Sequence, residues 1–142
     1  METIKKILFG LCIMLPLLMI LLMMIVGCQA TLSAADEIRI NSQFEVVYEL
    51  ASIPRRLPEL RYNTNPNWPI AAESNCISWS ITFNYGFAAS QPDFVIKYVI
   101  PHEMAHMISC HYRGSTENDS GDSHDDFWRR AVIRLGGDPN YI

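Results

Sequence analysis

The apolar positions divide the 142-residue chain into two parts. From Ile7 to Gly27 no residue is charged, and this run follows a short leader that carries Lys5 and Lys6. A cationic start before an apolar block is typical of export signals. The run is longer than the roughly 7–15 apolar residues of a cleaved signal peptide and close to the ~20 that span a bilayer. The pattern therefore predicts an N-terminal apolar membrane segment.

Beyond residue 28 the apolar positions become periodic. They predict a first helix over residues 36–52, ending before Pro54. Its apolar positions follow the spacing of one helix face: Phe44, Val47, Tyr48 and Ala51. Residues 54–74 are rich in Pro, Asn and Arg. We expect an irregular connection there, with one short strand near residues 60–63.

Strict alternation of apolar and polar residues predicts a β-strand over residues 77–84. Its apolar positions are Ile77, Trp79, Ile81 and Phe83, and its polar positions are Ser78, Ser80, Thr82 and Asn84. This pattern is typical of a strand with one buried and one hydrated face.

A long helix is predicted from Asp93 to His111. Ser90 and Asp93 are spaced like a capping box that opens it. Pro101 lies inside this stretch, where an interior proline costs about 3 kcal/mol. Either the helix kinks at Pro101, or Pro101 begins a separate helix, a position where proline is favourable.

The last predicted helix follows a polar loop. Ser123 can cap it, and Asp125 and Asp126 suit the positive end of its dipole. The glycine pair at 136–137 ends it. Its apolar side consists of Phe127, Trp128, Ala131, Val132 and Leu135. Together these elements predict an α+β fold in which helices pack on a short β-sheet.

Charge argues against nucleic acid as a partner. The formal net charge is −4, whereas proteins that follow phosphates usually present a basic face. The most concentrated arginines, Arg129, Arg130 and Arg134, lie on one side of the last predicted helix, where a solvated face explains them.

The cysteines suggest how the chain is anchored. The apolar run ends in Ile25-Val26-Gly27-Cys28, which resembles the bacterial lipoprotein box, in which the cysteine is acylated and becomes the mature N-terminus. The alternative is an anchor that stays uncleaved. In both cases the leading lysines remain cytoplasmic, so the rest of the chain is extracytoplasmic.

Two of the four cysteines, Cys76 and Cys110, lie in the part of the chain beyond residue 28. The other two are Cys12, inside the apolar run, and Cys28 at its end. An oxidising compartment would permit a Cys76–Cys110 disulfide. Two buried free thiols are the alternative.

The candidate metal-binding and catalytic residues lie in the motif His102-Glu103-Met104-Ala105-His106. On a helix, residues four apart project from the same face about 5–6 Å apart, so His102 and His106 can bind one metal ion. Glu103 lies beside them and can accept a proton from water that the metal activates. The motif predicts hydrolysis assisted by zinc.

A catalytic zinc needs a third protein ligand and an open position. The metzincin pattern would require histidine at 112, where this chain has Tyr112. His111 lies about 140° round the helix from His106, and the surroundings of Glu117 and the loop aspartates match no zinc motif. His124 is left, although the two aspartates that follow it could supply an oxygen ligand from nearly the same place.

The strings VIPHEMAHMI and SHDDFWRRAVIRLGGDP resemble the SprT-like metallopeptidases. The predicted helices and strands over residues 44–139 come in the same order as in this family. The sequence motifs themselves match only from Val99 onward. The resemblance implies a small zincin-like domain at residues 29–142, after a leader or anchor at 1–28. It also implies that His102, His106 and His124 bind zinc and that Glu103 is the general base. Many relatives also carry DNA-binding parts, which we do not expect here.

The leading hypothesis is a membrane-anchored, extracytoplasmic zinc metallopeptidase. Its protein or peptide substrate would pair with the polar edge of the strand at residues 78–84. The alternatives are a non-catalytic metal-binding lipoprotein, against which Glu103 argues, and a zinc amidase acting on cell-wall peptides. Tyr85, Tyr98 and Tyr112 are candidates to stabilise an oxyanion, although packing explains each of them better.

Overall fold

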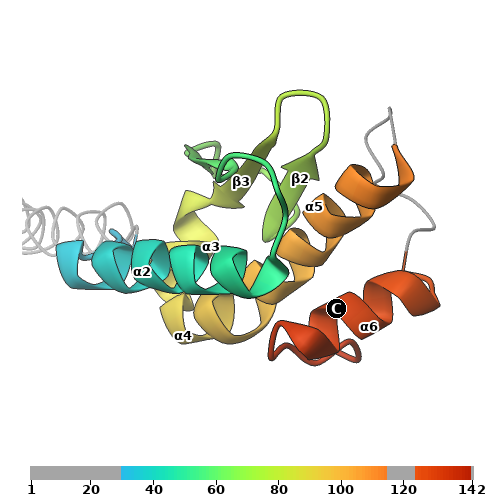
Figure 1. Cartoon of the computed structure of the whole chain (residues 1–142). Coiled ribbons are helices and arrows are strands. Elements are labelled where there is room, and N and C mark those ends of the chain that lie inside the picture. Colours follow the sequence, from blue (N-terminus) through green and yellow to red (C-terminus); the bar gives the residue numbers. More distant parts are fainter. Residues whose placement is uncertain (1–29, 115–123, 142) are drawn as a thin grey trace, which may run out of the picture. The chain divides into compact units, whose positions relative to one another are not determined.

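The computed structural model describes residues 30–114 and 124–141 (Figure 1). The apolar segment, Cys28, Glu117 and Ser123 lie outside this part of the chain. Thr31 begins a compact unit that extends to the C-terminus. None of the helices described in it has the length and apolar character of a membrane span.

Helix α2, Ala34–Ala51, confirms the first predicted helix. Ser33 caps its start, because the serine hydroxyl accepts a hydrogen bond from the Asp36 N–H at 3.1 Å. Ser52 ends the helix in the left-handed conformation. The buried face follows the predicted period: Ile40, Phe44, Val47 and Ala51.

The sheet has three strands: β1 (Glu59–Asn63), β2 (Ala72–Asn75) and β3 (Ser80–Asn84). Their order is β1-β3-β2, so β3 is central. Strand β1 runs parallel to β3, and β2 runs antiparallel to it. The sequence predicted β1 closely and missed β2.

The predicted strand over residues 77–84 is wrong in its first part. Residues 76–79 form the turn between β2 and β3, and Ile77 is 73% exposed. The Asn75 side chain accepts hydrogen bonds from the backbone N–H groups of Ile77 and Ser78, which stabilises the turn. Trp79 is nevertheless buried. The alternation of apolar and polar residues in the sequence therefore continues into a turn, which the Asn75 side chain stabilises.

Four consecutive helical segments follow the sheet: α3 (Tyr85–Ser90), α4 (Pro92–Phe94), the π-helical turn η1 (Val95–Val99) and α5 (Ile100–Arg113). The predicted capping box at Ser90 is wrong. Ser90 ends α3, and its hydroxyl donates to the Phe87 carbonyl at 3.0 Å. The side chain of Asn84 caps the start of α3 instead.

Pro101 is the second residue of α5. It does not begin a separate helix, because Val99 and Ile100 before it have helical backbone and α5 continues from η1. The π turn η1 leads directly into α5, and the Ile100 N–H donates to the Val95 carbonyl five residues earlier. The π turn η1, which is wider than an α-helical turn, thus comes just before Pro101, which has no backbone N–H to donate.

Helix α6, Asp126–Arg134, is capped by Asp125 and not by the predicted Ser123. The Asp125 carboxylate accepts hydrogen bonds from the N–H groups of Phe127 and Trp128, both at 3.0 Å. A carboxylate at this end also complements the helix dipole. Beyond the helix, a Cβ on Gly137 would lie 2.7 Å from the Cβ of Pro101. Only glycine allows α5 and the end of α6 to approach so closely.

Helix α5 lies at the centre of the unit, where it contacts α2, β2 and α6 (Figure 1). Every residue from Ile100 to Cys110 is buried. Cys110 forms a disulfide with Cys76, with a Cα–Cα distance of 5.6 Å, so the disulfide alternative is confirmed. The bond joins the turn after β2 to the last part of α5.

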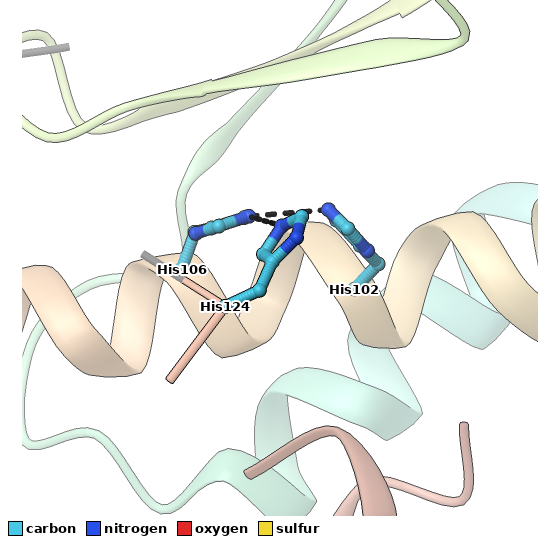
Figure 2. A group of neighbouring side chains, drawn as sticks. All are labelled: His102, His106 and His124. Atoms are coloured by element: carbon cyan, nitrogen blue, oxygen red, sulfur yellow. Dashed lines mark hydrogen bonds between the residues drawn. The ribbon is translucent and has the colours of Figure 1, made fainter. Parts of the chain in front are cut away.

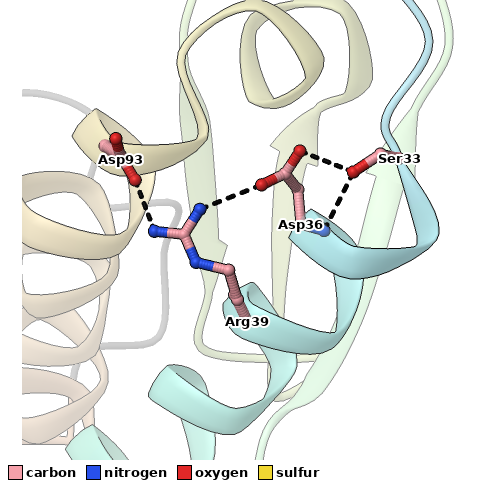
Figure 3. A network of polar contacts seen from close by, with 4 residues as sticks. All are labelled: Ser33, Asp36, Arg39 and Asp93. Atoms are coloured by element: carbon pink, nitrogen blue, oxygen red, sulfur yellow. Dashed lines mark hydrogen bonds and ion pairs between the residues drawn. The ribbon is translucent and has the colours of Figure 1, made fainter.

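An exposed ion-pair network joins α2 to α4 (Figure 3). Arg39 contacts Asp36 at 3.0 Å and also Asp93 of α4. Water and salt screen the attraction between exposed charges of this kind. The network therefore adds little to the stability that the buried face of α2 provides.

Candidate metal centre

His102 and His106 lie one helical turn apart on α5. Both are buried, and their Nε2 atoms are 3.1 Å apart. Their spacing in the sequence predicted this arrangement, because residues four apart share a helix face.

His124 completes the cluster from the segment immediately before α6 (Figure 2). Its Nε2 lies 3.3 Å from the Nε2 of His106, and one ligand nitrogen from each of the three histidines lies within 4.8 Å of the other two. Imidazole nitrogens bound to a tetrahedral zinc at 2.0–2.1 Å are about 3.3 Å apart. The three histidines can therefore hold one metal ion.

The start of α6 is joined to the end of α5, which positions His124. Arg113 forms an ion pair with Asp125 at 2.6 Å, and its guanidinium lies 4.8 Å from the centre of the Phe127 ring. Asp125 is also the helix cap, so it is already engaged. The His124 ring packs on Trp128, with ring centres 4.1 Å apart.

Trp128 forms the apolar surroundings of the cluster. It is 1% exposed, and its ring centre lies 4.7 Å from that of His102 and 5.6 Å from that of His106. One indole thus touches all three imidazoles. A buried aromatic ring in this position limits the access of water to the ligands from that side.

Burial favours the neutral form of His102 and of His124, because it lowers the pKa of both imidazoles. It lowers the pKa of His102 to about 3, and the positive charges that His106 and His124 would carry add to the effect. Neutral imidazole is the form that binds a metal. The Nδ1 atom of His102 is buried and has no hydrogen-bond partner among the described residues. An acceptor commonly orients this nitrogen in metal sites.

Glu103 follows His102 on α5 and is also buried, 6% exposed. Burial raises the pKa of its carboxyl to about 7, against the opposing effect of a hydrogen bond from the Ser74 side chain. The Ser74 hydroxyl contacts both the carboxylate of Glu103 and its backbone carbonyl, the latter at 3.0 Å. A carboxyl group that titrates near neutral pH suits general acid–base catalysis.

The other candidate ligands lie elsewhere. His111 is half-buried and contacts the ring of Tyr112, and it is not part of the histidine cluster. Asp125 caps α6, and Asp126 does not belong to the cluster either. Glu117 and the loop aspartates lie in residues 115–123, which are not described.

The three tyrosines considered for an oxyanion lie in different surroundings. The Tyr85 hydroxyl accepts a hydrogen bond from the Leu32 N–H at 3.3 Å. Tyr98 stacks on Tyr141, with ring centres 4.3 Å apart. Tyr112 is 58% exposed.

Sequence reasoning missed two residues of the site. Ser74 lies in a stretch without periodic apolar residues and meets Glu103, 29 positions away, only after folding. Trp128 was predicted to lie on the apolar side of its helix, but its contact with the imidazoles carried no signal of its own.

Comparisons with protein-family models, with curated proteins and with solved structures found no match. The donor set itself restricts the chemistry. Imidazole ligands suit zinc, copper, iron and nickel. Three histidines also leave a fourth position of a tetrahedral ion open, as hydrolytic zinc sites require.

Proposed function

We propose that the chain is a zinc-dependent metallopeptidase of the SprT-like type, anchored in a membrane and facing away from the cytoplasm. One observation carries the proposal: the ligand atoms of three histidines converge, and a buried glutamate that is not one of them follows His102 on the same helix. A site that only bound metal would gain nothing from Glu103. Burying a carboxyl group costs free energy, so its position favours a chemical role.

His102, His106 and His124 would hold the ion. A zinc ion bound there supplies a Lewis acid that polarises the peptide carbonyl and acidifies water. Glu103 accepts the proton of the attacking water and then donates it to the leaving amine. Its pKa of about 7 allows both transfers near neutral pH.

Strand β2 is the favoured place for the substrate backbone. The sequence suggested the edge at residues 78–84, but that prediction is wrong, because β3 pairs on both sides and Ser78 lies in a turn. Among the described strands, β2 pairs only with β3, and it contacts α5. An extended peptide added to β2 would therefore run beside α5, the helix that carries His102 and His106.

The leader and the disulfide support the proposed location. A lysine-first apolar segment that ends in Cys28 would anchor the chain by lipidation or as an uncleaved helix. The Cys76–Cys110 bond is of the kind that persists in oxidising compartments.

Peptide cleavage tests the proposal. The purified full chain is incubated with a randomised peptide library, then treated with a chelator, and finally supplied with zinc. We expect cleavage of internal peptide bonds that stops with the chelator and returns with zinc. Bound metal without cleavage would favour the non-catalytic lipoprotein. Cleavage confined to cell-wall peptides would favour the amidase.

A further inference from the structure

Ser74 contacts the proposed general base from a different element. It lies on β2, whereas Glu103 lies on α5, and its hydroxyl reaches both the carboxylate and the backbone carbonyl of that residue. No other side-chain hydrogen bond to the Glu103 carboxylate is recorded among the described residues. The backbone N–H of Ser74 also bonds to the carboxylate, and the hydroxyl is the part of this contact that a side-chain substitution removes.

The position of Ser74 is set from two sides. In the antiparallel pair of β2 and β3, Ser74 lies opposite Ile81, whose side chain is fully buried. Two residues further on, Cys76 is bonded to Cys110 of α5. The strand pairing and the disulfide together keep β2 against the metal helix.

Orientation matters because the carboxylate must reach the proton of a water molecule near the histidines. A buried glutamate has several staggered rotamers, and most of them would direct its oxygens away from one given point. A misplacement of about 1 Å in an active site can lower a rate on the order of 100-fold. A hydroxyl that fixes one rotamer therefore affects the chemical step more than the binding of substrate.

We propose that Ser74 is a positioning residue that orients the carboxylate of Glu103 toward the histidine cluster. This role rests on the proposed peptidase function. Ser74 does not touch the substrate bond in this account, and it acts only through Glu103. Strand β2 would then have two roles, since it pairs with the substrate and also positions the base.

Three variants of the full chain test the role: Ser74→Ala, Ser74→Thr and Ser74→Val. Threonine and valine have the same shape and differ by the hydroxyl. We expect Ser74→Val and Ser74→Ala to lower kcat on the order of 10-fold to 100-fold, with KM and zinc content unchanged. Ser74→Thr should recover most of the activity. If the alanine variant folds poorly, the threonine and valine pair still isolates the hydroxyl.

Ser109→Ala is the matched control. Ser109 is a buried serine on α5, and its hydroxyl donates to the Ala105 carbonyl at 3.1 Å and not to Glu103. Its kcat should stay close to that of the parent. Equal kcat values for the threonine and valine variants, in a parent that hydrolyses peptides, would overturn the role of Ser74 alone. If the parent shows no hydrolysis, or if its hydrolysis does not depend on Glu103, the proposed function and the role of Ser74 are both overturned.

Discussion

Removing the Cys76–Cys110 disulfide should destabilise the domain strongly. The bond closes a loop with a sequence separation of 34 residues. In the chain-entropy treatment, a cross-link over a loop of this length lowers the entropy of the unfolded state enough to stabilise the fold by about 4 kcal/mol. For a domain of this size, that loss corresponds to a fall in Tm of about 15 °C.

The measurement compares three samples of the full chain by denaturant and thermal unfolding: the oxidised parent, the reduced parent and the double variant C76A/C110A. The reduced parent shows the effect of the bond without any change of side chain. We expect both samples that lack the bond to unfold at similar, much lower denaturant concentrations. A loss below about 1 kcal/mol in both would refute the reasoning, because the loop would then be held by other contacts already present in the unfolded chain.

Three further predictions address the site, the packing and the anchor. Replacing His124 with Ala should weaken zinc binding and abolish hydrolysis, while His111→Ala should do neither; metal content and peptide cleavage of the two variants check this. Gly137→Ala should cost about 1–3 kcal/mol, because the added methyl would lie 2.7 Å from a Pro101 carbon and 2.8 Å from a Val132 carbon; denaturant unfolding measures the loss. Cys28→Ser should leave an unprocessed precursor, and a variant that migrates and partitions like the parent would favour the uncleaved anchor.

The elements that the sequence predicted well are those whose pattern reflects burial on one face. Helix α2 and strand β1 carry such a pattern and lie within two residues of the expected bounds. Strand β2, with the sequence Ala-Glu-Ser-Asn, has no apolar alternation at all. It becomes a strand because its backbone pairs with β3 across the turn at residues 76–79, while its own side chains carry no strand pattern.

Capping residues were harder to predict because several polar side chains compete for the same role. Asp125 caps α6, where the sequence suggested Ser123. Asn84 caps α3, and Ser90, which resembled the start of a capping box, ends that helix. Each candidate has the right chemistry, and only the path of the backbone decides between them.

The same distinction applies to the site. His102, Glu103 and His106 are close in the sequence, and helix geometry alone brings the two imidazoles together. His124 was harder to assign, because its position depends on a loop and on the joining of α6 to α5. Ser74 could not be predicted, since its contact with Glu103 exists only in the packed structure.

The most direct test of the metallopeptidase proposal is the variant Glu103→Gln, assayed for both zinc and hydrolysis. Glutamine keeps the size and much of the hydrogen bonding of glutamate but cannot accept the proton from water. We predict that the purified variant carries the same amount of zinc as the parent and has lost hydrolysis of a peptide that the parent cleaves. Loss of zinc would make Glu103 a ligand, and retained hydrolysis would remove it from the reaction; either result would contradict the account.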